Sequence, residues 1–115
     1  MAKKEAPVLQ RMYLFLQWLI RRVNHFPRSQ RFILGDRIEN SALDIQRLLV
    51  QAVFSRQKKD ILRQANLELE QLRWLLRLAH DEKLLTRDQY YFAADCLHEI
   101  GRQVGGWQKQ ASRTP

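Results

Sequence analysis

Cysteine, proline and glycine are scarce in this 115-residue sequence, and the scarcity of each excludes a class of structure. The single cysteine, Cys96, excludes a disulfide framework and leaves too few thiolates for a structural zinc site. Only three prolines and four glycines occur, and no stretch alternates apolar and polar residues as a half-buried β-strand does. Turn-rich β folds are therefore excluded, and the remaining period near 3.5 residues predicts helices.

Long apolar runs are also missing. The most apolar segment follows Pro7, but Gln17 interrupts it and Arg21 and Arg22 end it, so it is too short to span a bilayer. The residues before Pro7 lack the pattern of a secretory signal peptide. We therefore expect a cytoplasmic protein that has no membrane association.

No constellation of catalytic or metal-binding residues is recognisable. The three histidines, His25, His80 and His98, fall in different predicted helices or turns. Asp95 and His98 have the spacing of one carboxylate–histidine pair of a di-iron bundle, but such a site needs a second pair and further inward glutamates. We expect no enzymatic activity, no metal and no cofactor. The alternative, an enzyme built on a helical bundle, predicts a bound metal or cofactor.

Hydrophobic periodicity predicts four helices, at residues 7–24, 29–54, 58–80 and 86–108, followed by a loose tail at 109–115. Pro7 suits the first turn of the first helix, and Ser29 is the predicted N-cap of the second. Thr86 and Gln89 have the spacing of a capping box at the start of the fourth. Four such helices joined by short turns predict a single domain over residues 1–115, an all-α, up-down-up-down antiparallel four-helix bundle.

Apolar residues predict which helix faces are buried. The second and third predicted helices each carry one apolar line with helical spacing: Ile38, Ala42, Ile45, Leu49 and Ala52, then Leu62, Ala65, Leu69, Leu72, Leu76 and Ala79. A further line on the third helix, Leu67, Trp74 and Leu78, needs a cover, either the fourth helix or another subunit. The first helix is apolar around most of its circumference. This excess favours a homo-oligomer, although one central, fully covered helix would also account for it.

Positive charge dominates the composition. Twenty Lys and Arg against 12 Asp and Glu give a net charge of +8, and 14 of the 20 are Arg. Arginine binds phosphate through a planar, bidentate fork, and a basic surface gains affinity for polyanions by releasing their counterions. The alternative is that the charge only keeps a helical surface soluble. We favour nucleic-acid binding by charge and shape.

An antiparallel bundle gathers many of these charges at its two ends. One end contains the turn between the second and third helices, with Lys58 and Lys59, and Arg63 one turn later. The opposite end contains Arg21 and Arg22. These five side chains are predicted to contact nucleic acid or a polymerase.

The polar stripe of the third predicted helix joins the two ends. It contains Arg73 and Arg77. The stripe is either a basic track for a phosphate backbone or a solvated face on which Glu70 pairs with Arg73. The pattern alone leaves both interpretations open.

Four segments resemble one known family. In order, they read FPRSQRF at 26–32, LGDRI at 34–38, LRWLLRLA at 72–79 and EIGRQVGGW at 99–107. In this order and spacing they are similar to the accessory variability determinant (Avd) proteins of diversity-generating retroelements, over about Leu9 to Lys109. A sister group is similar too: four-helix proteins encoded in intervening sequences of bacterial large-subunit ribosomal RNA genes. The closing segment is more like the retroelement group.

The resemblance implies a function that composition alone does not show. It implies a homopentameric, basic barrel that binds the retroelement reverse transcriptase and a nucleic acid, either the template RNA or DNA. The reverse transcriptase makes cDNA in which adenines are miscopied. Arg73 and Arg77 match the family's Leu-Arg repeats and are carried over as contacts to RNA or polymerase, as is Arg102. The sister group implies instead a structural homo-oligomer with an unknown scaffold or RNA-associated role.

Overall fold

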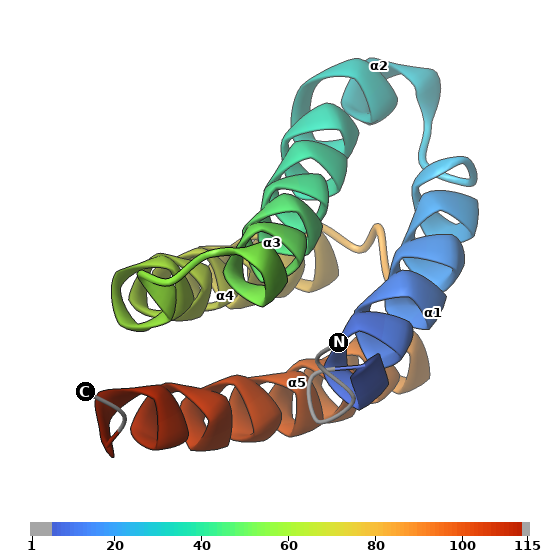
Figure 1. Ribbon diagram of the computed structural model, residues 1–115. Helices are drawn as coiled ribbons and strands as arrows, with labels where there is room; N and C mark the ends of the chain where they lie inside the picture. The colour runs from blue at the N-terminus through green and yellow to red at the C-terminus, as the bar shows by residue number, and fades with distance from the viewer. Residues whose placement is uncertain (1–5, 114–115) are drawn as a thin grey trace.

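The computed structural model describes residues 6–113, which form four long helices and one short helical connection. The long helices are α1 (Ala6–Val23), α3 (Asp36–Phe54), α4 (Lys58–Asp81) and α5 (Arg87–Arg113). They lie side by side and alternate in direction (Figure 1). No strand occurs in this part of the chain, so the predicted all-α class is confirmed for it.

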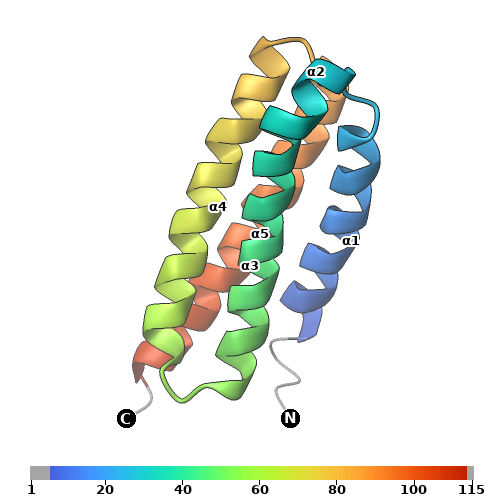
Figure 2. The same cartoon turned by 90° about the horizontal axis from the view of Figure 1, so that it is seen from above.

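Each long helix packs against two others. α3 lies between α1 and α4, and α5 packs against α4 and α1 on the other side. Figure 2 shows that the start of α1, the α3–α4 turn and the end of α5 lie at one end of the bundle. The bundle is 49 Å long, 23 Å wide and 20 Å deep. Within residues 6–113, no helix is long and apolar enough to cross a membrane.

The apolar lines predicted for the second and third helices form the centre of the core. All eleven of their residues, on α3 and α4, are buried. Met12 and Leu19 of α1 and Leu97 and Ile100 of α5 complete the same cluster. Removal of this apolar surface from water is the main force that holds the helices together.

The connection between α1 and α3 differs from the prediction. We expected one continuous helix over residues 29–54 with Ser29 as its N-cap. Instead, Pro27 precedes the one-turn helix α2 (Arg28–Gln30), which has no side-chain cap, and the π-helix η1 (Arg31–Gly35) leads into α3. A single π-helical turn changes the spacing of apolar residues too little to be distinguished from an α-helical turn. The sequence pattern therefore did not reveal the π-helix.

The fourth long helix extends beyond its predicted end. The loose tail expected from residue 109 is helical as far as Arg113. Gly105 and Gly106 lie within the helix, and neither has a positive φ. The residues after Gly106 include no glycine or proline up to Arg113, and the Ser112 hydroxyl donates to the Gln108 carbonyl at 3.0 Å. The helix therefore meets no residue that would stop it there.

The start of α5 agrees with the prediction. The backbone N–H of Thr86 donates to Oε1 of Gln89 at 3.0 Å, and the backbone N–H of Gln89 donates to Oγ1 of Thr86 at 3.1 Å. These reciprocal bonds are the predicted capping box. They fix the point at which the α4–α5 turn ends.

Candidate nucleic-acid interface

The eight basic residues predicted to bind a partner do not form one continuous site. They occupy three regions: Lys58, Lys59 and Arg63 at the start of α4, Arg21 and Arg22 at the end of α1, and Arg73, Arg77 and Arg102 between the two ends. The contacts of each side chain determine whether its charge is available to a ligand. Those contacts differ sharply among the eight.

At the α3–α4 turn, one lysine is hydrogen-bonded to the backbone, whereas the nearby basic residues Lys59 and Arg63 are exposed. Nζ of Lys58 donates to the carbonyls of Ala52 at 2.7 Å and Val53 at 3.0 Å, so this lysine caps the end of α3. Lys59 is exposed and has no partner among the described residues. Arg63 is also exposed, and its guanidinium lies 3.9 Å from the carboxylate of Asp60. Such an exposed pair is weak and readily exchanged for a phosphate.

Arg73 is used inside the fold. Its Nη2 donates to the backbone carbonyl of Leu97 on α5 at 3.2 Å, and its Nη1 donates to Glu70 at 3.0 Å. Gly101 makes room for this contact, because a Cβ atom at that position would lie 2.7 Å from Nη2 of Arg73. The pairing with Glu70 that the sequence suggested is therefore present, and the same side chain joins α4 to α5.

Arg77 lies one turn further along α4 and remains exposed. Its Nε is 3.8 Å from the Asp81 carboxylate, and its guanidinium carbon is 5.8 Å from the centre of the Trp74 ring. Neither contact crosses to another helix. The Arg77 charge is thus at the surface, next to an exposed indole.

Substitution of these two arginines should separate their roles. We expect Arg73→Gln to lower the free energy of unfolding by about 1 kcal/mol, because it removes a charged hydrogen bond between two helices at a half-buried position. Arg77→Gln should change it by less than about 0.5 kcal/mol, because its ion pair is exposed. Chemical denaturation followed by circular dichroism measures both. Equal losses for the two variants would contradict the bridging role of Arg73.

Arg102 is paired within its own helix. Its Nε donates to Glu99 at 3.0 Å, and a second, short bond joins Nη2 to the other oxygen of the same carboxylate. The hydrogen bond from Arg102, followed by the one from Gln103, lowers the pKa of Glu99 to about 2, and the same carboxylate raises the pKa of Arg102. Its charge is therefore largely neutralised by Glu99 at neutral pH.

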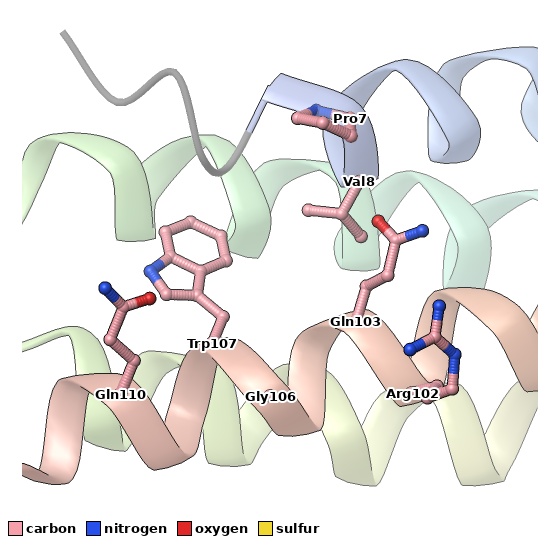
Figure 3. A pocket seen from close by; sticks show the side chains of 7 residues that line it. All are labelled: Pro7, Val8, Arg102, Gln103, Gly106, Trp107 and Gln110. Carbon is pink, nitrogen blue, oxygen red and sulfur yellow. The ribbon is translucent and has the colours of Figure 1, made fainter.

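A shallow groove borders this ion pair. It encloses about 330 Å³ between the start of α1 and the second half of α5. In Figure 3 the side chains of Gln103 and Trp107 point from α5 toward Pro7 and Val8. Trp107 is itself buried, so the groove offers little aromatic surface for a ligand.

The end of α1 carries charge that no acid neutralises. Arg21 is exposed, and its side chain has no partner among the described residues. Arg22 is half-buried, and its Nε is enclosed without a hydrogen-bond partner. The sequence pointed to these two arginines by charge alone. It did not show that Phe32 and Ile33 lie exposed in the connection that follows them.

The remaining reactive groups are dispersed. Cys96 is half-buried on α5, and burial, followed by the charge of Asp95, raises the pKa of its thiol. A raised pKa keeps the thiol protonated and poorly nucleophilic at neutral pH. Over residues 6–113, no three His, Cys, Asp or Glu side chains come together as metal ligands.

Several large apolar side chains remain exposed outside the core, and two groups of them lie on α1, α3 and α4. We call Leu67, Trp74 and Leu78 the α4 surface; it faces away from the other helices, and Trp74 remains 61% exposed. The fourth long helix therefore does not provide the cover that the sequence analysis required. We call Tyr13, Ile20, Leu43 and Val50 the α1–α3 surface; all four are exposed. Tyr13 and Ile20 lie on α1, and Leu43 and Val50 lie on α3.

Taken together, these features define a small four-helix protein with basic and apolar side chains at its surface. The profile of the bAvd-like family matches residues 8–111, and the chain belongs to this family. The family resemblance predicted from the four segments is thereby confirmed. Membership suggests an accessory role in diversity-generating retroelements. No curated protein matches the chain.

Proposed function

We propose that this chain is a non-catalytic, cytoplasmic accessory subunit that binds a retroelement reverse transcriptase and its template RNA during mutagenic cDNA synthesis. The observation that carries the proposal is the family match over residues 8–111, which includes most or all of each long helix. The match favours the retroelement group over the ribosomal intervening-sequence group. No residue of the chain is assigned a catalytic step.

Unpaired basic side chains support the RNA-binding part of the proposal. Arg56 and Lys59, at the α3–α4 end of the bundle, are exposed, and their side chains have no partner among the described residues. Each can release counterions when it meets a phosphate. The surface has no element shaped to enter a groove and read bases, so binding follows charge and shape.

The two apolar surfaces support assembly into a ring. A ring with an odd number of subunits needs a heterologous interface, in which each copy uses two different surfaces. The α4 surface and the α1–α3 surface are different from each other, and the exposed polar residues of α3 lie between them: Asn40, Asp44, Arg47 and Gln51. A homopentamer would bring five copies of the basic α3–α4 end together and raise affinity for RNA by avidity.

Salt dependence tests the RNA-binding proposal. Affinity for the retroelement template RNA, measured by fluorescence anisotropy across a salt series, should fall with a logarithmic slope of about −0.7 to −0.9 per phosphate contacted. The variant Arg56→Gln/Lys59→Gln should reduce the size of that slope by about 1.5, because two contacts are removed. Its fold should be unchanged, because neither side chain has a partner within the described residues.

Arg47 supplies the control for this experiment. It lies exposed on α3, 3.9 Å from Asp44 and within reach of Gln51, so its charge is already partly neutralised. Arg47→Gln should leave the slope within error of the wild type. A flat salt response of the wild-type chain, or an equal change in both variants, would contradict the proposal.

A further inference from the structure

The connection between α1 and α3 holds two large apolar side chains in water. Phe32 and Ile33 are adjacent in η1 and are 61% and 70% exposed, whereas the next two residues, Leu34 and Gly35, are buried. The backbone N–H of Asp36 donates to the carbonyl five residues back, which is the hydrogen bond of a π-helix. π-helical turns are rare and often occur at functional sites.

This connection is fixed against the end of α1. A Cβ atom at Gly35 would lie 2.8 Å from Cγ1 of Val23, so the π-helix approaches α1 more closely than any other residue would allow. The Arg31 guanidinium also donates to the carbonyl of Asn24 at 3.1 Å. Phe32 and Ile33 are therefore presented by a constrained backbone, which reduces the conformational entropy lost when a partner binds them.

Positive charge is concentrated in the segment that contains the apolar pair. The segment 21–37 contains five arginines and a single acid, Asp36; the arginines are Arg21, Arg22, Arg28, Arg31 and Arg37. None of the five forms an ion pair within the described residues. The Nε atoms of Arg22 and Arg31 are enclosed and have no hydrogen-bond partner. The α4–α5 turn at the same end carries both signs of charge, so the excess belongs to this segment.

The nature of the apolar pair distinguishes between two kinds of partner. An RNA site would use aromatic rings on which bases stack, but Ile33, the more exposed of the two, has no π face. An apolar centre with arginines around it is instead the composition of a protein–protein contact. A partner complementary to this segment would carry an apolar pocket bordered by Asp and Glu side chains, because five arginines without an ion pair favour acidic partners.

We propose that this corner, formed by Phe32, Ile33 and the five arginines of segment 21–37, docks into an acid-rimmed apolar pocket of the polymerase partner. The proposal rests on the proposed function, which supplies that partner. It assigns polymerase docking to this corner of the bundle and leaves RNA binding to other basic side chains. The corner thus has a role that differs from that of the α3–α4 end.

Polymerase binding by a corner variant tests this assignment. The probe is the purified reverse transcriptase of the same retroelement, and binding is measured by biolayer interferometry together with RNA affinity. Phe32→Ser/Ile33→Ser should weaken polymerase binding by about tenfold or more and leave RNA affinity unchanged. Both side chains are exposed, so the helical circular dichroism should be retained. Arg28→Glu should slow association, most strongly at low salt.

Phe54 provides the matched control, because it is equally apolar and exposed but lies at the opposite end of the bundle. The Phe54→Ser variant should bind the polymerase with the same affinity as the wild type. If wild type and the Phe32→Ser/Ile33→Ser variant bind the polymerase equally, the corner is not the docking surface. If the variant loses RNA affinity instead, the corner is an RNA site and the assignment is overturned. A wild-type chain that does not bind the polymerase overturns the proposed function and this assignment with it.

Discussion

Leu69→Ala is expected to lower the free energy of unfolding by about 2–5 kcal/mol, which is the cost of a cavity in a closely packed core. Leu69 is 1% exposed on α4, at the centre of the bundle. A domain of this size has a total stability of about 5–15 kcal/mol, so the loss is a large fraction of it. Urea denaturation followed by circular dichroism, at one fixed and low protomer concentration, measures the change.

Leu67→Ala makes the same chemical change two residues earlier in the same helix. Leu67 is 68% exposed, so its truncation leaves no cavity and should change the free energy of unfolding of the protomer by less than about 0.5 kcal/mol. The two variants differ only in the helix face they alter. Similar losses for both would show that α4 is rotated relative to the bundle described here.

The register of α3 and α4 was predictable from the sequence because two patterns agreed. On each helix an apolar line and a polar line keep the same spacing over several turns, and only one rotation of the helix buries one line and exposes the other. The capping box at Thr86 and Gln89 fixed the start of α5 in the same way, since it depends only on residues three positions apart.

The contacts of the basic side chains were not predictable, because their partners lie far away in the sequence or on the backbone. Arg73 donates to the carbonyl of Leu97, 24 residues away, in a position that a Cβ atom at Gly101 would crowd. Lys58 donates to two carbonyls at the end of α3. The sequence gives the number of charged side chains, but tertiary packing determines which of them are already bonded to other groups of the protein.

Residue spacing also predicted one unbroken helix over residues 29–54, where the structure has α2, η1 and α3 in succession. The wide turn of η1 keeps Leu34 and Ile38 buried, so the apolar pattern passes through it without a break. The same turn leaves the side chains of Phe32 and Ile33 exposed to solvent, and these are the residues proposed to contact the polymerase. Local geometry of this kind is fixed by the close contact of Gly35 with Val23, which no periodic pattern contains.

Trp74→Glu is expected to have the largest effect on assembly. Trp74 is the largest side chain of the α4 surface, and in a ring it would be buried against the next copy. In the ring, a carboxylate at this position would be buried without a partner. The free energy needed to desolvate it exceeds the association free energy of a single interface of this kind. Analytical ultracentrifugation should show the wild type as a ring and the variant as a protomer of 13.8 kDa.

Gln51→Glu is the control, since it adds the same charge at an exposed polar position of α3 between the two apolar surfaces. It should leave the ring intact. Loss of the ring in both variants would indicate a general effect of negative charge and would contradict a specific role for Trp74.

A mixing experiment then distinguishes the two possible symmetries of the interface. Tyr13→Glu damages the α1–α3 surface, just as Trp74→Glu damages the α4 surface, so each variant alone should be a monomer. In a heterologous interface the two variants each keep one intact and complementary surface, and an equimolar mixture should form a heterodimer with a single complete contact. In an isologous interface one surface meets its own copy, so only the variant damaged in that surface is monomeric, and the other variant dimerises without mixing. A heterodimer would therefore show that the chain has the two-surface interface that a five-membered ring requires.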